Sequence, residues 1–304
     1  MKVLSQQTTL GYGANNNTAF KSALLYSPKS PLHKINPVIR FMDDVFQRSL
    51  TVSRKLWLSA NEEIAPYLTI ENISYGKNFT TRAWDINKGN RSKYLIVLHG
   101  LSHNISSLQE LYQEVINKTE YAVLAPEYYG FTPENQEFIY LSPQKLLKST
   151  NAALKYLRDK GIKESDIAVL GHSFGGFPAA DFAEKHPQLE RLILVSCINT
   201  NLHWADAIKN GHPKGVPTNI QKLVRNYKIA TMQFGWIFNT AKRLKGVKVP
   251  VDIIHAREDK RVKKSTAEKL ANQCQNLHSL LILNKGSHKM DSDKIDTIVS
   301  VLNN

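Results

Sequence analysis

The sequence predicts an α/β fold built around a mainly parallel sheet. Between residues 94 and 196, short apolar runs alternate with longer amphipathic runs, and the alternation returns after residue 250. Strands that alternate with helices usually pair in parallel through right-handed crossovers. Hydrophobic residues make up 42% of the 304 residues and charged residues 22%, which is enough apolar material for a sizeable core.

The chain begins with a polar lead-in and one amphipathic helix. Residues 1–36 are rich in polar side chains and contain two prolines, which predicts irregular structure. Asn36 and Pro37 then form a typical helix start. Between residues 37 and 58 the apolar side chains fall on roughly half of the helix circumference. We expect this helix to pack on the core; a lid or a membrane-surface element is the alternative.

The following segments predict an antiparallel hairpin and then the parallel core. The hairpin is expected from strands at 69–75 and 80–86 around a polar turn. Later strands are expected at 94–98, 121–125, 166–170, 191–196, 251–255 and 279–283. Helices are expected at 106–118, 143–160, 174–185, 265–275 and 291–302. The predicted architecture is a sheet of about eight strands flanked by helices.

Residues 199–248 interrupt the alternation with further helical patterns. Because ligands of open α/β sheets bind outside the carboxyl ends of the strands, we expect this insertion to form a small helical cap there. The predicted organisation is an N-terminal extension at 1–68, a core made of 69–198 and 249–304, and a cap at 199–248.

Residues 169–177 (VLGHSFGGF) combine a short strand, a tight turn and the start of a helix. Gly171 and Gly175 permit a turn too tight for Cβ atoms, so that the hydroxyl of Ser173 projects from a strained corner. The amide of Phe174, in the first turn of the helix, then faces a bound oxyanion. The motif also occurs by chance in loops, but here a strand precedes it and a helix follows.

A nucleophilic serine needs a base, and the base needs an acid that orients it. His288 directly follows the strand expected at 279–283, and Asp259 follows the strand before that one. If these strands are parallel neighbours, both side chains reach the sheet edge that carries Ser173. We therefore expect Ser173 to be the nucleophile, His288 the base and Asp259 the acid. Glu258 is the alternative acid because it is adjacent and chemically competent.

The buried strand at 94–98 ends in His99-Gly100-Leu101. Gly100 lets the chain turn so that the Leu101 amide points inward, where it forms an oxyanion hole with the Phe174 amide. We expect His99 to brace this loop and to transfer no proton. The histidine before the nucleophile, at position 172, is also expected to be structural.

These motifs resemble those of the α/β-hydrolase fold family over about residues 69–303. The resemblance rests on His99-Gly100, Gly171-His172-Ser173-Phe174-Gly175-Gly176, Asp259 with Val262, and Gly286-Ser287-His288. It implies a Ser173, His288, Asp259 triad, oxyanion amides at Leu101 and Phe174, and a cap between the sixth and seventh strands. One stretch departs from the pattern. Where many members carry Asp-x-x-Gly-x-Gly, residues 126–131 read Pro-Glu-Tyr-Tyr-Gly-Phe.

The expected activity is hydrolysis of a carboxylic ester or thioester through an acyl-enzyme, with no metal or other cofactor. Aromatic residues are candidates for lining an apolar acyl pocket, with ordinary core packing as the alternative. They are Phe131, Trp204, Phe234, Trp236 and Phe238. A lipase or acylglycerol hydrolase acting at a membrane surface is a second interpretation. A non-catalytic binding module of the same fold is a third.

The net charge of +14 is concentrated in two segments. Residues 199–249 carry nine lysines and arginines against one aspartate, a net charge of +8; residues 1–60 carry eight against two, a net charge of +6. Such segments attract anionic partners: an acidic carrier protein, an acyl-CoA or an anionic lipid surface. A generally basic surface without a specific partner is the alternative. The sequence has no recognised nucleic-acid-binding motif and indicates no oligomeric state.

Cysteine usage and hydropathy bear on the compartment. The two cysteines, Cys197 and Cys274, lie in apolar or helical patterns, which disfavours a disulfide framework. The N-terminus has no apolar run of signal-peptide length, and no run reaches the length of a membrane span. We therefore expect a cytoplasmic protein, with peripheral membrane association left open.

Overall fold

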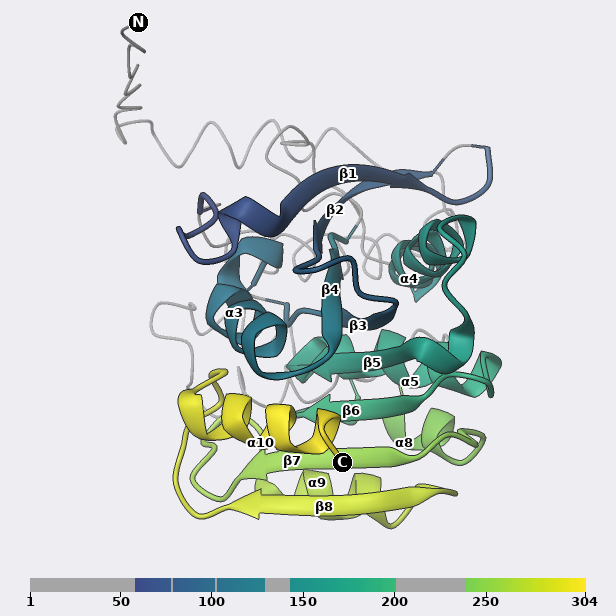
Figure 1. Ribbon diagram of the computed structural model, residues 1–304. Coiled ribbons are helices and arrows are strands. Elements are labelled where there is room, and N and C mark those ends of the chain that lie inside the picture. The colour runs from purple at the N-terminus through teal and green to yellow at the C-terminus, as the bar shows by residue number, and fades with distance from the viewer. Residues whose placement is uncertain (1–57, 78, 102, 129–142, 201–238) are drawn as a thin grey trace, which may run out of the picture. The chain divides into compact units, whose positions relative to one another are not determined.

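The computed structural model describes residues 58–77, 79–101, 103–128, 143–200 and 239–304 (Figure 1). These residues form one eight-stranded sheet in the order β1-β2-β4-β3-β5-β6-β7-β8. The strands are β1 (Leu68–Ser74), β2 (Thr80–Ile86), β3 (Lys93–Leu98), β4 (Tyr121–Pro126), β5 (Ile167–His172), β6 (Arg191–Val195), β7 (Val251–Ala256) and β8 (Leu277–Leu283). Strand β2 pairs antiparallel with β1 and β4, and the other pairings are parallel. The predicted fold class is confirmed.

Helices cover both faces of this sheet. Helices α3 (Gln109–Lys118) and α10 (Ser292–Leu302) pack on one face (Figure 1). The other face carries α4 (Pro143–Asp159), α5 (Gly176–Lys185), α8 (Thr240–Leu244) and α9 (Lys264–Ala271). Short 3-10 turns lie at η2 (Ala65–Tyr67), η3 (Ile105–Leu108), η4 (Glu164–Asp166) and η5 (Ser173–Gly175).

Strand β3 lies at the centre of a two-sided core. Its side chains alternate between the faces: Tyr94, Ile96 and Leu98 join the cluster of α4 and α5, while Leu95 and Val97 join that of α3 and α10. A strand with helices on both faces must be apolar at every position. This explains the uninterrupted apolar run from which the strand was predicted.

The strand order reverses beside β3. The chain passes from β3 through α3 to β4 on one side, and then through α4 to β5 on the other side. Ligands of open α/β sheets bind outside the carboxyl ends of the strands at such a reversal. Leu98 is paired with Gly171 in the register of β3 and β5, so both strands end at the same level. The predicted nucleophile, Ser173, follows directly on this edge.

Three predicted helices differ in extent from the observed ones by two residues or more at one end. The helix expected from residue 106 starts within the turn η3, and α3 begins at Gln109. The helix expected at 265–275 ends at Ala271. Beyond it, the amides of Gln273 and Cys274 donate to carbonyls three residues back, which is the spacing of a 3-10 turn and not of an α-helix. The amide of Gln275 then donates to Leu244 of α8. The helix expected from residue 174 starts as the turn η5, and α5 begins at Gly176.

Helix α8 lies at the end of the range predicted as a cap. Its Leu244 is fully buried in the same cluster as α5. Nε of Arg243 lies 2.9 Å from Oδ1 of the buried Asp181, and Nη1 donates to Glu184 at 3.0 Å. The described end of this range is thus anchored to α5, while residues 201–238 lie outside the described residues.

The predicted N-terminal helix at 37–58 also lies outside the described residues, apart from its last position. Within the described part of the chain, no helix is both long and apolar enough to cross a membrane. The two cysteines are both free thiols, with Cys197 buried and Cys274 half-buried.

Candidate active site

Ser173 occupies a strained corner between β5 and α5. Its φ angle is +54°, a left-handed conformation that side chains other than glycine rarely adopt. The corner is too crowded for side chains on either flank. A Cβ atom at Gly175 would lie 2.2 Å from the carbonyl oxygen of Leu98, and one at Gly171 would lie 2.6 Å from the oxygen of Gly175. The two glycines are therefore required by close backbone contacts, and the serine alone carries the left-handed conformation.

The structure brings Ser173, His288 and Asp259 into one hydrogen-bonded chain. The hydroxyl of Ser173 lies 2.9 Å from Nε2 of His288, and Nδ1 of His288 lies 2.8 Å from Oδ2 of Asp259. Ser173 follows β5, Asp259 follows β7 and His288 follows β8, so all three leave the sheet at its carboxyl edge. With Nδ1–H donated to the carboxylate, Nε2 is free to accept the proton of the serine hydroxyl.

Asp259, and not Glu258, is the carboxylate that contacts His288. Its side chain is buried, whereas Glu258 is exposed. Oδ1 of Asp259 accepts hydrogen bonds from the amides of Arg261 and Val262 at 2.8 and 2.9 Å. Burial alone would raise the pKa of Asp259, but the hydrogen bond from His288 and those two amides outweigh it and hold the pKa below its ordinary value. The carboxylate is therefore ionised at neutral pH and held at a fixed orientation.

The loop after β3 runs against the nucleophile. A Cβ atom at Gly100 would lie 3.3 Å from both Cβ of Ser173 and Nδ1 of His172, so a larger residue would fit there only if these atoms shifted by a few tenths of an ångström. Leu101 follows Gly100 directly and is half-buried, and Phe174 follows Ser173 in the turn η5. Each of the two predicted oxyanion residues is thus adjacent in sequence to a residue of the site: Leu101 to Gly100, which contacts Ser173, and Phe174 to Ser173 itself.

Comparisons with known proteins agree with the fold described above. A family model described as serine aminopeptidase, S33, matches residues 89–230. The esterase Pf2001 from Pyrococcus furiosus has a TM-score of 0.62 at 17% identity, with 82% of this chain and 96% of that chain covered. Est1E from Butyrivibrio proteoclasticus has a TM-score of 0.56 at 18% identity, with 77% and 96% covered. An esterase/lipase from an uncultured bacterium has a TM-score of 0.57 at 16% identity, with 88% and 96% covered. The chain has the α/β-hydrolase fold. No curated protein matches the sequence.

The departure from the α/β-hydrolase pattern after β4 places a second buried carboxylate near the site. Glu127 is fully buried, and its Oε1 lies 2.6 Å from Nε2 of His99. Oε1 also accepts from the amide of Tyr128, and Oε2 accepts from that of Ile105. Nδ1 of His99 donates to the carbonyl of Gly100 at 2.8 Å. His99 therefore lies in a structural network, as expected. Its partner Glu127 follows no motif in the sequence that predicts a role for it.

His172 contacts the turn that carries His288. It is fully buried, and its Nε2 donates to the carbonyl of His288 at 3.1 Å. Burial, followed by the neighbouring His288 and His103, holds the pKa of His172 well below its ordinary value. The ring is therefore neutral at physiological pH, with its proton on Nε2.

The five aromatic residues predicted to line an acyl pocket lie outside the described residues. They are Phe131, Trp204, Phe234, Trp236 and Phe238. The aromatic lining of the acyl pocket therefore stays a prediction. The expected cap over the site also stays a prediction.

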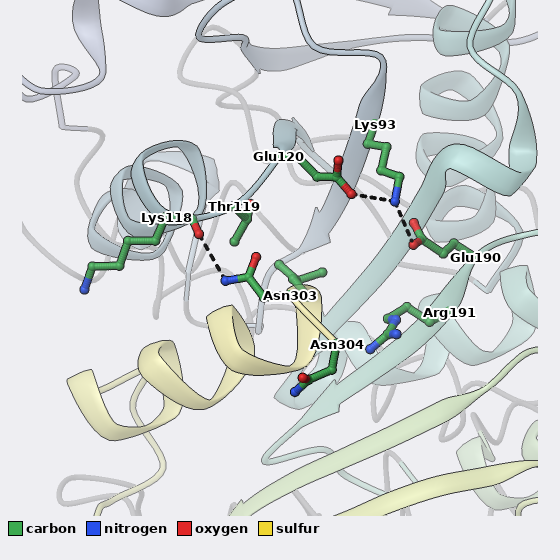
Figure 2. A pocket seen from close by; sticks show the side chains of 9 residues that line it. Lys93, Lys118, Thr119, Glu120, Glu190, Arg191, Asn303 and Asn304 are labelled. Carbon is green, nitrogen blue, oxygen red and sulfur yellow. Dashed lines mark hydrogen bonds and ion pairs between the residues drawn. The ribbon is translucent and has the colours of Figure 1, made fainter.

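A polar hollow of about 480 Å³ lies at the amino ends of the parallel strands, opposite the carboxyl ends that carry the site (Figure 2). It is lined by Lys93 and Arg191, the first residues of β3 and β6, and by the carboxyl-terminal ends of α3 and α10. Figure 2 shows Lys93 between the carboxylates of Glu120 and Glu190. Its Nζ lies 2.6 Å from Oε1 of Glu120 and 3.4 Å from Oε1 of Glu190. Because the hollow faces the amino ends of the strands, it is separate from the edge that carries Ser173.

Proposed function

We propose that this protein is a serine hydrolase that cleaves a carboxylic ester or thioester through an acyl-enzyme intermediate. The observation that carries the proposal is the hydrogen-bonded chain from Ser173 through His288 to Asp259. Two of the neighbours reported above are named as an esterase and an esterase/lipase, which supports the same class of reaction.

In the proposed reaction, Ser173 attacks the acyl carbon while His288 takes the hydroxyl proton on Nε2. The ionised Asp259 stabilises the imidazolium that forms and keeps its tautomer fixed. His288 then donates this proton to the departing alcohol or thiol. A water molecule, deprotonated by His288, finally hydrolyses the ester on Ser173 and restores the free enzyme.

The negative charge that develops on the acyl oxygen needs hydrogen-bond donors. We assign this role to the amides of Leu101 and Phe174. The contact of the Gly100 backbone with Ser173 supports the first assignment. The place of Phe174 in the turn directly after the nucleophile supports the second. Removing one donor of an oxyanion hole typically costs about 10²- to 10³-fold in kcat.

The substrate is proposed to carry an acyl chain and an anionic or carrier-linked portion. The basic composition of residues 199–249 supports attraction of an acidic carrier protein, an acyl-CoA or an anionic lipid surface. Screening by salt tests this part separately. If the attraction is electrostatic, KM for an acyl-CoA rises as the salt concentration increases from 0.05 to about 0.5 M, and KM for a neutral ester does not.

A panel of p-nitrophenyl esters and acyl thioesters of graded chain length tests the proposed chemistry. The wild-type protein should hydrolyse some members and should be labelled by a fluorophosphonate probe, whereas Ser173→Ala should do neither. If Ser173→Ala retains the wild-type rates, the assigned nucleophile is wrong. If the wild type neither hydrolyses the panel nor reacts with the probe, the protein is a binding module of this fold. Preference for emulsified over dissolved long-chain esters would indicate a lipase.

A further inference from the structure

The turn that carries His288 has an unusual set of contacts. It joins β8 to α10, and three consecutive carbonyls in it accept hydrogen bonds from buried side chains. Nζ of Lys294 donates to Ser287 at 2.7 Å and to Lys289 at 3.0 Å. Nε2 of His172 donates to the carbonyl of His288 between them. The backbone on both sides of the imidazole is therefore fixed from two directions.

Lys294 is a costly residue to place there. Its side chain is 0% exposed, although lysine is rarely fully buried, and it lies in the first turn of α10, where the helix dipole disfavours a cation. The cost is offset by complete use of its protons, because the ammonium has three donors and three acceptors. The third acceptor is Oδ2 of Asp291 at 2.7 Å.

Asp291 links the ammonium to the same turn. Its Oδ2 accepts from the amide of Ser287 at 3.1 Å, and its side chain caps the start of α10. Burial alone would raise the pKa of Asp291, but the hydrogen bonds from Lys294 and from the Ser287 amide hold it below the ordinary value. The carboxylate of Asp291 is thus ionised, and its bonds connect the turn to a helix whose Ile295 and Ile298 are buried in the core.

His172 supplies the connection to the nucleophile. It is the last residue of β5 and directly precedes Ser173. Its backbone is therefore held by the same strand that holds the strained corner at Ser173. Its hydrogen bond to the His288 carbonyl therefore sets the distance between the strand that carries the nucleophile and the turn that carries the base.

We propose that Lys294 and His172 are positioning residues for His288. Together they hold the three carbonyls of its turn so that Nε2 stays within hydrogen-bond distance of Ser173. This inference rests on the proposed function, because it assigns the base of that reaction. Neither residue takes part in the chemistry. Their contribution is preorganisation, and a displacement of about 1 Å in a reacting group can cost up to about 10²-fold in rate.

The test compares Lys294→Met with Ile298→Ala. Lys294→Met keeps an unbranched chain of similar length but removes the three donors. Ile298→Ala removes buried methyl groups from the same helix without touching the turn, and it controls for lost stability. We expect Lys294→Met to lower kcat by about 10- to 100-fold with KM nearly unchanged, at temperatures where it is fully folded. Ile298→Ala should lower Tm and leave kcat unchanged. Equal kcat for Lys294→Met and the wild type would overturn the proposal for Lys294.

His172→Phe supplies a second, independent variant. It keeps an aromatic ring under the turn and removes both ring nitrogens, including the Nε2 donor to the His288 carbonyl. We expect kcat to fall by about 10-fold or more, again with little change in KM. An unchanged kcat would remove His172 from the proposal and leave Lys294 as the sole positioning residue.

A spectroscopic readout separates this proposal from the proposed function. The proton on Nδ1 of His288, held by Asp259, should give a downfield resonance that is protected from exchange and is lost in His288→Gln. We expect Lys294→Met to broaden or abolish it, and Ile298→Ala to retain it. If the wild type hydrolyses no ester but this pattern is seen, the proposed function fails and the positioning role stands. If the resonance is unchanged in folded Lys294→Met, the positioning role fails whatever the activity.

Discussion

His99 and Glu127 form a buried pair that joins the loop after β3 to the end of β4. Nε2 of His99 lies 2.6 Å from Oε1 of Glu127, and neither side chain is more than 1% exposed. The second oxygen of the carboxylate accepts from the amide of Ile105. One carboxylate thus holds the loop of residues 99–105 at both ends, and this loop contains the proposed oxyanion residue Leu101.

Replacing Glu127 by alanine should destabilise the protein strongly. The change leaves His99 and the amides of Ile105 and Tyr128 without the acceptor they have in the core. Breaking a buried pair by removing one partner typically costs about 3–5 kcal/mol, and we expect a loss in that range in the free energy of unfolding. Urea denaturation followed by circular dichroism measures it. Glu127→Gln, which keeps the length and one acceptor oxygen, should lose less; equal losses for the two variants would contradict the argument.

The contrast between Asp259 and Glu127 shows what could be predicted from the sequence. Asp259 and His288 each follow a strand that periodicity identifies, and a known chemistry requires both residue types beside a serine. Glu127 also follows a strand, yet it contacts a loop and takes no assigned part in that chemistry. Its only sequence signal is the departure from the Asp-x-x-Gly-x-Gly pattern, which by itself names no partner.

The burial of Lys294 cannot be predicted from the sequence, for a different physical reason. Lysine is usually exposed, so its place in an amphipathic helix suggests the solvent face. Its burial depends on how the turn at 287–289 folds back over the first turn of α10, and no local pattern encodes that. The opposite holds for β3, where every residue from Tyr94 to Leu98 is apolar and burial on both faces follows directly.

At position 173, a glycine variant should be more stable than an alanine variant, which is the reverse of the usual order of stability. Glycine normally destabilises relative to alanine, because it loses more backbone entropy on folding. At a φ of +54°, however, alanine retains the left-handed strain of about 1–2 kcal/mol, which glycine relieves. Both variants lack the hydroxyl, so their difference isolates the backbone. We expect Ser173→Gly to be more stable than Ser173→Ala by about 1 kcal/mol in urea unfolding. The normal order would show that the corner is unstrained.

Separate substitutions of the adjacent residues Asp259 and Glu258 should show which carboxylate orients His288. Asp259→Asn keeps the size of the side chain but favours the wrong tautomer of His288, and such a change lowers kcat by about 10⁴-fold in serine proteases. We expect a loss of about 10³- to 10⁴-fold in kcat with little change in KM. Glu258→Gln, at an exposed position, is the matched control and should stay within about twofold of the wild type. Comparable losses in both variants would mean that the two carboxylates share the role.

Buried histidines should make the protein less stable below about pH 6.5. His255 is fully buried, and its Nε2 donates to the carbonyl of Val262 at 2.9 Å. Burial outweighs the contributions of that hydrogen bond and of Asp259, so the pKa of His255 is lowered. As the pH falls below the ordinary value near 6.5, the unfolded chain binds a proton that the folded chain does not. Stability is therefore fully present above that pH and is lost as the pH falls toward the folded pKa.

His255→Gln should weaken this dependence. Glutamine retains a donor for the Val262 carbonyl but does not titrate. Each such histidine contributes a slope of at most about 1.4 kcal/mol per pH unit, and His172 contributes in the same direction. We expect the free energy of unfolding of the variant to fall less steeply than that of the wild type between pH 6.5 and 5, by up to about 1 kcal/mol per unit. Between pH 7.5 and 8.5 the two proteins should show parallel curves, because His255 is neutral there in both the folded and the unfolded chain. Parallel curves down to pH 5 would show that His255 is protonated in the folded protein as readily as in the unfolded chain.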